Sequence, residues 1–228
     1  MFDLVIFDCD GVLVDSEVLS AEAEAEAFAA CGIPMSAEDI LTSLVGLSEG
    51  AMCDWVEEYY GIRPTETFFT LYRQRREELF AHSLAPCLGV ADAIAALDVP
   101  VCVASNSPVH RIAHSLSVTG LASLFGRHVY SADHVSRPKP APDLFLHAAA
   151  QFGVSPARCL VIEDSPLGAI AARMAGMTCF GYCGASHIRD GHEEKLLRQG
   201  VSATFRDMAE LNRIIATHTD MTALQASA

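Results

Sequence analysis

The stretch VIFDCDGVLVDS, residues 5–16, begins as an apolar segment typical of a buried β-strand and ends in acidic residues. Asp8 and Asp10 stand one residue apart, and Asp15 follows near the end of the stretch. Carboxylates this close repel one another unless a cation holds them together. The stretch therefore raises the question of which positive charge lies at the end of this strand.

The composition of the 228-residue chain is that of a globular protein, with 51% apolar and 19% charged residues. No apolar run is long enough to cross a bilayer, and the N-terminus lacks the basic region and cleavage site of a secretory signal. The eight cysteines are scattered without C-x-x-C spacing, which indicates reduced core thiols. We expect a soluble, cytoplasmic protein without a membrane partner.

The charge balance is strongly acidic, with 15 Lys plus Arg against 29 Asp plus Glu and a formal net charge of −14. Such a surface repels nucleic acid, which is bound largely through basic patches. We therefore expect no nucleic-acid partner. An anionic substrate would need a local pocket of reversed potential. A monomer or weak homo-oligomer requires no special assumption.

The pattern of helices and strands changes along the chain. Residues 16–85 read as about four helices and no strand, with helix starts at Ser36, Ser48 and Pro64–Thr65. Residues 86–228 alternate short apolar strands with helices of about ten residues, which indicates a parallel sheet covered on both faces. We expect an α/β core of residues 1–15 and 86–228, interrupted by an all-helical insert at 16–85.

Polar residues follow several of the predicted strands. Ligands of open parallel sheets bind beyond the carboxyl ends of the strands. The polar residues at such positions are Asp8 and Asp10 after the first strand, Ser105 and Asn106 after VCVA, Glu163 and Asp164 after CLVI, and Lys139 in the loop RPKPAPD. Separate segments thus deliver polar groups to one rim of the sheet.

Each group has chemistry suited to a phosphate and a metal ion. Asp8 and Asp164 offer the hard anionic oxygens that Mg2+ prefers. Ser105 and Asn106 offer neutral donors just before a helix N-terminus, whose partial positive charge favours an anion. Lys139 adds a positive charge that reverses the local potential.

Each motif also has an ordinary structural interpretation. Asp10–Gly11 could be a simple turn. Ser107 is expected to cap the following helix, and the segment Glu163–Ser165 could cap another. Lys139 could be a solvated surface lysine. These interpretations are acceptable one by one, but together they would place all the polar groups at one rim without a purpose.

Four motifs together resemble the haloacid dehalogenase superfamily. The sequences FDCDGVLVDS, ASNS, RPKPAPD and VIEDSPLG occur in that order between residues 7 and 168. They are similar to the phosphatase and beta-phosphoglucomutase-like branch that carries a small helical cap. This resemblance implies a Rossmann-like parallel sheet and a cap over residues 16–85.

The resemblance implies a role for each residue at the rim. Asp8 would be the nucleophile that becomes an aspartyl phosphate, and Asp10 would be the general acid and then the base. Mg2+ would be held by Asp8, Asp164 and the Asp10 backbone carbonyl, with Glu163 nearby or linked through water. The residues expected to cradle the phosphate are Ser105, Asn106 and Lys139.

Asp10, Glu49 and the lack of a histidine in the first predicted cap helix favour one of the reactions that the resemblance allows. Dehalogenases lack the second aspartate, so Asp10 favours phosphoryl transfer to or from an oxygen. Mutases of this branch commonly carry a cap arginine where the stretch VGLSEGA has Glu49, and a histidine that the first predicted cap helix lacks. We therefore expect a phosphatase acting on a small phosphorylated metabolite, a sugar phosphate or sugar-acid phosphate. A beta-phosphoglucomutase-type mutase is the alternative.

The sequence leaves open where the Arg75 side chain points and whether the phosphorylated ligand is turned over. Arg75 falls within the apolar stripe of the predicted helix at 64–83, so it either extends to solvent or faces an anionic group of the substrate. The protein could also bind a phosphorylated ligand without turnover and act as a regulator, although a pure binder has little need of a nucleophile and a base.

Overall fold

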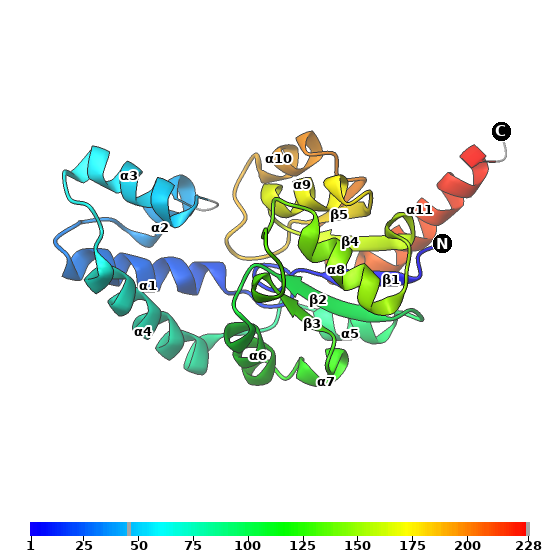
Figure 1. The fold of residues 1–228 in the computed structure, drawn as a ribbon, viewed down its shortest axis with the longest axis horizontal. Coiled ribbons are helices and arrows are strands. Elements are labelled where there is room, and N and C mark those ends of the chain that lie inside the picture. Colours follow the sequence, from blue (N-terminus) through cyan, green and yellow to red (C-terminus); the bar gives the residue numbers. More distant parts are fainter. Residues whose placement is uncertain (45–46, 227–228) are drawn as a thin grey trace. The chain divides into compact units, whose positions relative to one another are not determined.

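The computed structural model describes residues 1–44 and 47–226, and the chain forms two compact units (Figure 1). The core unit comprises Met1–Val14 and Pro86–Ala228, and the helical unit comprises Asp15–Ala85. The chain leaves the core unit after Val14 and returns at Pro86, and these two residues form an isolated β-bridge. Each unit has its own hydrophobic core.

The core unit is built on a six-stranded sheet in which every neighbouring pair is parallel. The strand order is β3-β2-β1-β4-β5-β6. The strands are β1 (Leu4–Phe7), β2 (Val101–Ser105), β3 (Val129–Ser131), β4 (Cys159–Glu163), β5 (Thr178–Tyr182) and β6 (Ala203–Phe205). The central strand β1 is therefore flanked by β2 and β4, whose carboxyl ends carry Ser105 and Glu163.

Helices cover both faces of this sheet, with α8, α9 and α10 on one side and α5, α6 and α7 on the other (Figure 1). The helices are α5 (Val90–Ala95), α6 (Val109–Val118), α7 (Ala122–Phe125), α8 (Asp143–Phe152), α9 (Pro166–Met174), α10 (His192–Arg198) and α11 (Leu211–Ala226). Short 3-10 helices span Ala132–His134, Pro156–Arg158 and Met208–Glu210. This arrangement confirms the predicted Rossmann-like α/β fold, although α7 and α10 were not expected.

Burial on both faces explains why β1 is apolar throughout. All four residues of LVIF are fully buried. Leu4 and Ile6 pack in the cluster that contains Phe145 of α8 and Ala172 of α9. On the other face, the ring of Phe7 lies 6.3 Å from that of Phe125. A strand covered on both sides gains from apolar residues at every position, which fixes β1 at the centre of the sheet.

The helical unit contains α1 (Glu17–Ala30), α2 (Ala37–Ser43), α3 (Glu49–Tyr60) and α4 (Glu66–Ser83), with no strand among its described residues. Ser36 and Asp39 form the expected capping box at the start of α2. Phe28 and Phe68 stack at 4.3 Å in its core. None of the described helices in either unit is both long and apolar enough to cross a membrane.

Candidate active site at the carboxyl end of the sheet

Lys139 is the centre of the site, and it is buried. Its Nζ donates hydrogen bonds to Asp8 Oδ1 at 2.8 Å and to Glu163 Oε1 at 2.7 Å, and its side chain is only 3% exposed. Burial alone would lower the pKa of Lys139, but the two carboxylates outweigh burial and hold that pKa above its usual value. Lys139 is therefore a fixed positive charge between the ends of β1 and β4.

Asn106 positions the loop that carries Lys139. Its Nδ2 donates to the Lys139 carbonyl at 3.1 Å, and its Oδ1 accepts from the Lys139 N–H at 2.9 Å. The ammonium of Lys139 also lies 4.7 Å from the centre of the Phe145 ring on α8. The end of β2 thus fixes the main chain of Lys139 directly. The expected role of Asn106 as a phosphate donor stays a prediction.

Asp8, Glu163 and Asp164 form a buried acidic group. Each offers a carboxylate oxygen within 4.8 Å of the others. Burial raises the pKa of Asp8 well above its usual value, against the opposing charge of Lys139 and with the added charges of the neighbouring acids. Burial and the charge of Glu163 likewise raise the pKa of Asp164. Ionising both aspartates here requires more positive charge than Lys139 supplies.

This donor set fits a hard divalent cation such as Mg2+. Three carboxylates stand against one ammonium, and their oxygens are the ligands that Mg2+ prefers. Glu163 is already engaged, because its Oε2 accepts from the N–H of Ser165 at 3.0 Å and from the Ser165 hydroxyl at 2.9 Å. Asp8 and Asp164 are therefore better suited than Glu163 to hold the ion directly.

Asp10 lies in different surroundings from Asp8. Its Oδ2 accepts from the Ser107 hydroxyl at 2.5 Å and from Arg111 Nη2 at 2.8 Å. Its side chain is 13% exposed, and it is not part of the acidic group formed among the described residues. The predicted metal contact of Asp10 concerned its backbone carbonyl and stays a prediction. Ser107 and Arg111 hold the Asp10 carboxylate in place.

The predicted helix cap at Ser107 is wrong. The helix α6 begins at Val109, and the hydroxyl of Ser107 contacts Asp10 instead of the free N–H groups of that helix. Asp133 takes over the capping role, because its Oδ2 accepts from the N–H of Val109 at 2.9 Å. Ser105 is buried, and its hydroxyl accepts from the N–H of Ser107 at 3.1 Å. Both serines therefore shape the turn that follows β2.

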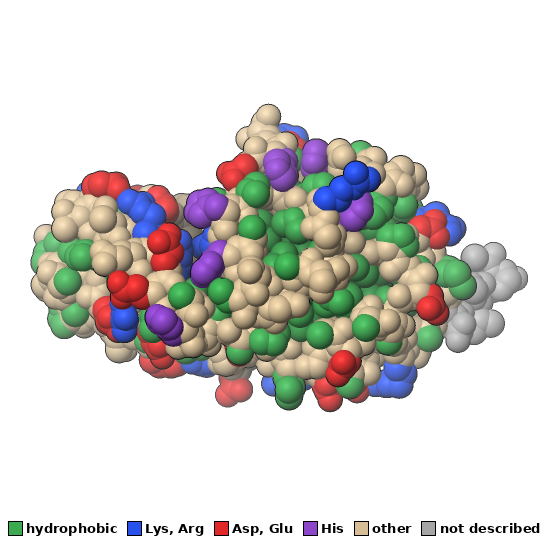
Figure 2. Space-filling view, turned by 90° about the horizontal axis from the view of Figure 1, so that it is seen from below, with side chains coloured by type: hydrophobic (Ala, Val, Ile, Leu, Met, Phe, Trp, Pro, Cys, Tyr) green, Lys and Arg blue, Asp and Glu red, His purple; other side chains and the backbone are tan. Residues whose placement is uncertain are grey.

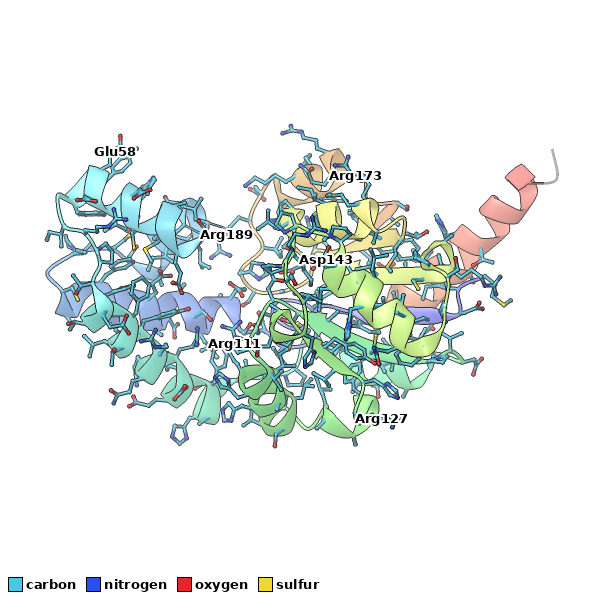
Figure 3. The ribbon with its side chains drawn as sticks, viewed as in Figure 1. Glu58, Arg111, Arg127, Asp143, Arg173 and Arg189 are labelled. Atoms are coloured by element: carbon cyan, nitrogen blue, oxygen red, sulfur yellow. The ribbon has the colours of Figure 1, made fainter. Side chains whose placement is uncertain are left out.

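Three side chains that contact the predicted site residues were missed in the sequence: Arg111, His187 and His192. Arg111 lies in the first turn of α6 (Figure 3), and its Nη2 donates to Asp10 Oδ2 and to the Ser107 hydroxyl. His187 and His192 contact Asp164 from the segment after β5. A basic residue in the first turn of a helix is disfavoured by the helix dipole, so the position of Arg111 was a usable signal of an acidic partner nearby. The histidines stand beside no recognised motif.

The two candidate residues of the helical unit, Arg75 and Glu49, take no part in the contacts described above. Arg75 forms ion pairs with Glu26 at 2.7 Å and Glu78 at 3.2 Å. Its guanidinium is thus held by two carboxylates of the same unit. Glu49 is exposed and is the first residue of α3. Of the stretch VGLSEGA, Val45 and Gly46 lie outside the described residues.

The comparisons with known proteins agree with the geometry. A family model for haloacid dehalogenase-like hydrolases matches residues 2–176. The 6-phosphogluconate phosphatase of Escherichia coli (strain K12) is 30% identical over 210 residues, which are 92% of each chain. A haloacid dehalogenase-like protein of unknown function from Agrobacterium tumefaciens has a TM-score of 0.90 and 38% identity, covering 96% of this chain and 100% of that one.

A putative beta-phosphoglucomutase from Thermotoga maritima is also similar in structure. Its TM-score is 0.76 at 27% identity, covering 94% of this chain and 99% of that one. The predictions of the superfamily and of a hydrolytic enzyme are thereby confirmed. The order of the four motifs, the parallel sheet and the rim of acids around Lys139 lead to one conclusion: the chain belongs to the haloacid dehalogenase-like hydrolase family.

Proposed function

We propose that this protein is a Mg2+-dependent phosphatase that hydrolyses a small sugar phosphate or sugar-acid phosphate through an aspartyl phosphate on Asp8. The observation that carries the proposal is the placement of Lys139 between Asp8 and Glu163, with Asp164 in the same buried group. A lysine here can neutralise a phosphate while the carboxylates hold a cation. The phosphatase relative with matching coverage supports the same reaction class.

The first half of the reaction uses both aspartates of the DCD stretch. A carboxylate oxygen of Asp8 attacks phosphorus, and the bond between phosphorus and the ester oxygen breaks. Asp10 gives its proton to the departing alkoxide, which leaves as an alcohol. Lys139 stabilises negative charge at the phosphoryl group, and Ser105 and Asn106 are proposed to donate to its oxygens.

The second half regenerates the enzyme. Asp10, now ionised, takes a proton from water as that water attacks phosphorus. The bond between phosphorus and Asp8 breaks, which releases inorganic phosphate and restores the Asp8 carboxylate. Mg2+, held by Asp8, Asp164 and the Asp10 carbonyl, would neutralise charge on the phosphate oxygens. The hydrogen bonds from Ser107 and Arg111 keep Asp10 oriented for both proton transfers.

The helical unit is proposed as the cap, residues 16–85, that selects the substrate. Phosphatase is preferred to mutase because Glu49 stands where a mutase would be expected to carry an arginine for the second phosphate. A carboxylate at that position repels a bisphosphorylated intermediate. We further propose a cytoplasmic protein that acts on a small molecule.

The proposal is tested with purified protein, Mg2+ and a panel of phosphate esters that includes 6-phosphogluconate and hexitol phosphates. We expect phosphate release from at least one of them and none after removal of Mg2+ with a chelator. Conversion of glucose 1-phosphate to glucose 6-phosphate, without phosphate release, would support the mutase instead. Binding of esters without turnover of any would leave a regulator as the better description.

The Asp8→Asn variant should lose activity by roughly 10³-fold or more, because an amide cannot serve as the nucleophile. It should remain folded, since the change removes one of several buried charges and leaves Lys139 paired with Glu163. Phosphate release and thermal unfolding measure the two effects. The exposed Asp98→Asn serves as the control with unchanged turnover. Near-normal turnover by Asp8→Asn would rule out the covalent mechanism.

A further inference from the structure

Two histidines from one segment hold Asp164, which the proposed function places at the metal. His187 lies in the loop after β5, and its Nε2 is 3.1 Å from Asp164 Oδ2. The side chains of the two residues are 5% and 7% exposed. A carboxylate that holds Mg2+ is ionised and only accepts hydrogen bonds, so in the metal-bound form Nε2 of His187 would carry the proton and donate it to Asp164. The neutral imidazole is sufficient for this contact.

His192 holds the main chain of the same aspartate. It is the first residue of α10, and its Nε2 lies 2.6 Å from the carbonyl oxygen of Asp164. A carbonyl can only accept, so Nε2 of His192 is also the donor. The two rings are nearly perpendicular, with centres 6.1 Å apart. The segment 187–192 thus contacts both the carboxylate and the backbone of Asp164.

The backbone of Gly11 also lies against the Asp164 carboxylate. A Cβ built on Gly11 would lie 2.0 Å from Asp164 Oδ2 and 3.0 Å from Cε1 of His187. The carboxylate therefore lies against the bare backbone of the turn after β1, with the imidazole beside it. The Gly11 backbone and the buried His187 ring thus both lie against Oδ2 and restrict the rotation of the Asp164 carboxylate. The carboxylates of Asp8 and Glu163 lie nearby and complete the acidic group.

We propose that His187 is a positioning residue for the metal site, orienting Asp164 for Mg2+, and that His192 supports it through the Asp164 backbone. The proposal rests on the proposed function, which makes Asp164 a metal ligand. Groups that hydrogen-bond to a ligating carboxylate fix its orientation, and their removal typically weakens metal affinity by about 10–100-fold. His187 acts through Asp164 and need not touch substrate.

The test compares His187→Ala and His187→Gln in the full-length protein. Mg2+ is titrated without substrate, at constant ionic strength, and its dissociation constant is taken from the rise in unfolding temperature. We expect His187→Ala to weaken Mg2+ binding about 10–100-fold, whereas His187→Gln, whose amide can donate, retains most of the affinity. At saturating Mg2+ the kcat of both variants should approach that of the wild type.

The matched control is His128→Ala. His128 is partly buried against Phe152 and precedes β3, at the opposite end of the sheet from the rim, so its loss should leave the Mg2+ affinity unchanged. A thermodynamic cycle with Asp164→Asn adds a second check. In that background His187→Ala should cause no further loss of Mg2+ affinity, because the carboxylate it orients is gone.

Several outcomes would overturn the inference. Unchanged Mg2+ affinity in His187→Ala would do so, as would equal losses in the alanine and glutamine variants, since equal losses indicate packing alone. If His187→Ala does not fold, His187→Leu and His192→Leu carry the test, because leucine fills similar space and cannot donate a hydrogen bond. Unchanged Mg2+ affinity in His187→Leu then overturns the inference, and normal Mg2+ affinity in His192→Leu removes the backbone contact from the proposal. A wild-type protein that binds no Mg2+ instead refutes the proposed metal site itself.

Discussion

Asp8 and Asp10 have the same side chain and separate surroundings. Asp8 is buried beside Lys139 and two further acids, whereas Asp10 is partly exposed and held by Ser107 and Arg111. Pairs of carboxylates with different environments are suited to different tasks, one as nucleophile and the other as acid and base. The difference comes from the partners that other segments bring to each residue.

Arg111 offers a prediction at the scale of one residue. Arg111→Ala removes the charge-assisted hydrogen bond from Nη2 to Asp10 Oδ2, so the Asp10 carboxylate loses a contact that fixes its direction. We expect kcat to fall about tenfold and KM to change less, because a small displacement of the proposed acid and base, Asp10, slows proton transfer. Steady-state kinetics on the best ester of the panel measure both constants.

The conservative variant Arg111→Lys should recover part of the lost kcat, since a lysine still carries the charge. The exposed Arg127, which precedes β3 and is labelled in Figure 3, gives the matched control Arg127→Ala with unchanged kinetics. A wild-type kcat in Arg111→Ala would show that Asp10 needs no support from α6.

At the scale of elements, the turn after β1 depends on a glycine. Gly11 has a φ of +77°. Its N–H donates to the Val14 carbonyl at 2.8 Å, and the N–H of Leu13 donates to the Cys9 carbonyl at 2.9 Å. Only glycine adopts this conformation without strain. The turn brings the backbone against the carboxylate of Asp164, so the end of β1 and the end of β4 meet at Gly11.

Gly11→Ala should therefore both destabilise the protein and reduce activity. Its Cβ would lie 2.0 Å from Asp164 Oδ2, in addition to about 1–2 kcal/mol of backbone strain. Gly153→Ala is the matched control, with φ of +66° and no atom within 4 Å of the added Cβ. Urea unfolding and phosphate release compare the two. Equal stability losses and equal activity would show that the turn tolerates a methyl group.

At the scale of the whole molecule, acidic residues dominate the charge. The formal net charge is −14, and Figure 2 shows Lys and Arg side chains scattered singly among Asp and Glu on the face it presents. At the candidate site, Lys139 forms an ion pair with Asp8, and Arg111 forms one with Asp10. The proposed phosphorylated substrate would therefore depend on these local positive charges and on a bound cation, because the molecule as a whole is acidic.

The stability of the protein should depend on pH through Glu24 of α1. Burial raises the pKa of Glu24 from 4.5 to about 7, with Glu17 adding to the effect and Arg76 opposing it. The folded state then binds a proton more tightly than the unfolded state. The protonated Glu24 side chain contributes fully to the free energy of unfolding below pH 4.5. As the pH rises to about 7, ionisation of Glu24 lowers that free energy by at most about 3 kcal/mol.

Glu24→Gln stays neutral at every pH and should remove this dependence. Relative to the wild type, we expect the free energy of unfolding of Glu24→Gln to be similar at pH 4.5 and higher at pH 8, as measured by urea unfolding. The exposed Glu22→Gln on the same helix is the control for the effect of the substitution itself. A constant difference for Glu24→Gln would contradict the prediction.

The sequence by itself determined the alternation of strands and helices, the caps at Ser36 and Ser48, and the polar residues at the strand ends. These features are local, since period, capping and turn chemistry act over a few residues. The short helices α7 and α10 were missed because their segments are brief and carry little periodic pattern. Local signals were thus enough to place Asp8, Asp10, Lys139 and Asp164 at one rim.

Only the tertiary structure decided which of these groups touch. Lys139 and Asp8 are 131 residues apart, and Arg111 and Asp10 are 101 apart. The contacts of His187 and His192 with Asp164 also join separate segments of the chain. The Ser107 hydroxyl likewise donates to Asp10 and does not cap α6. Contacts of this kind depend on how loops from different strands meet, and no local pattern encodes that meeting. Burial, which sets the pKa of Asp8, likewise exists only once the sheet and its helices are assembled.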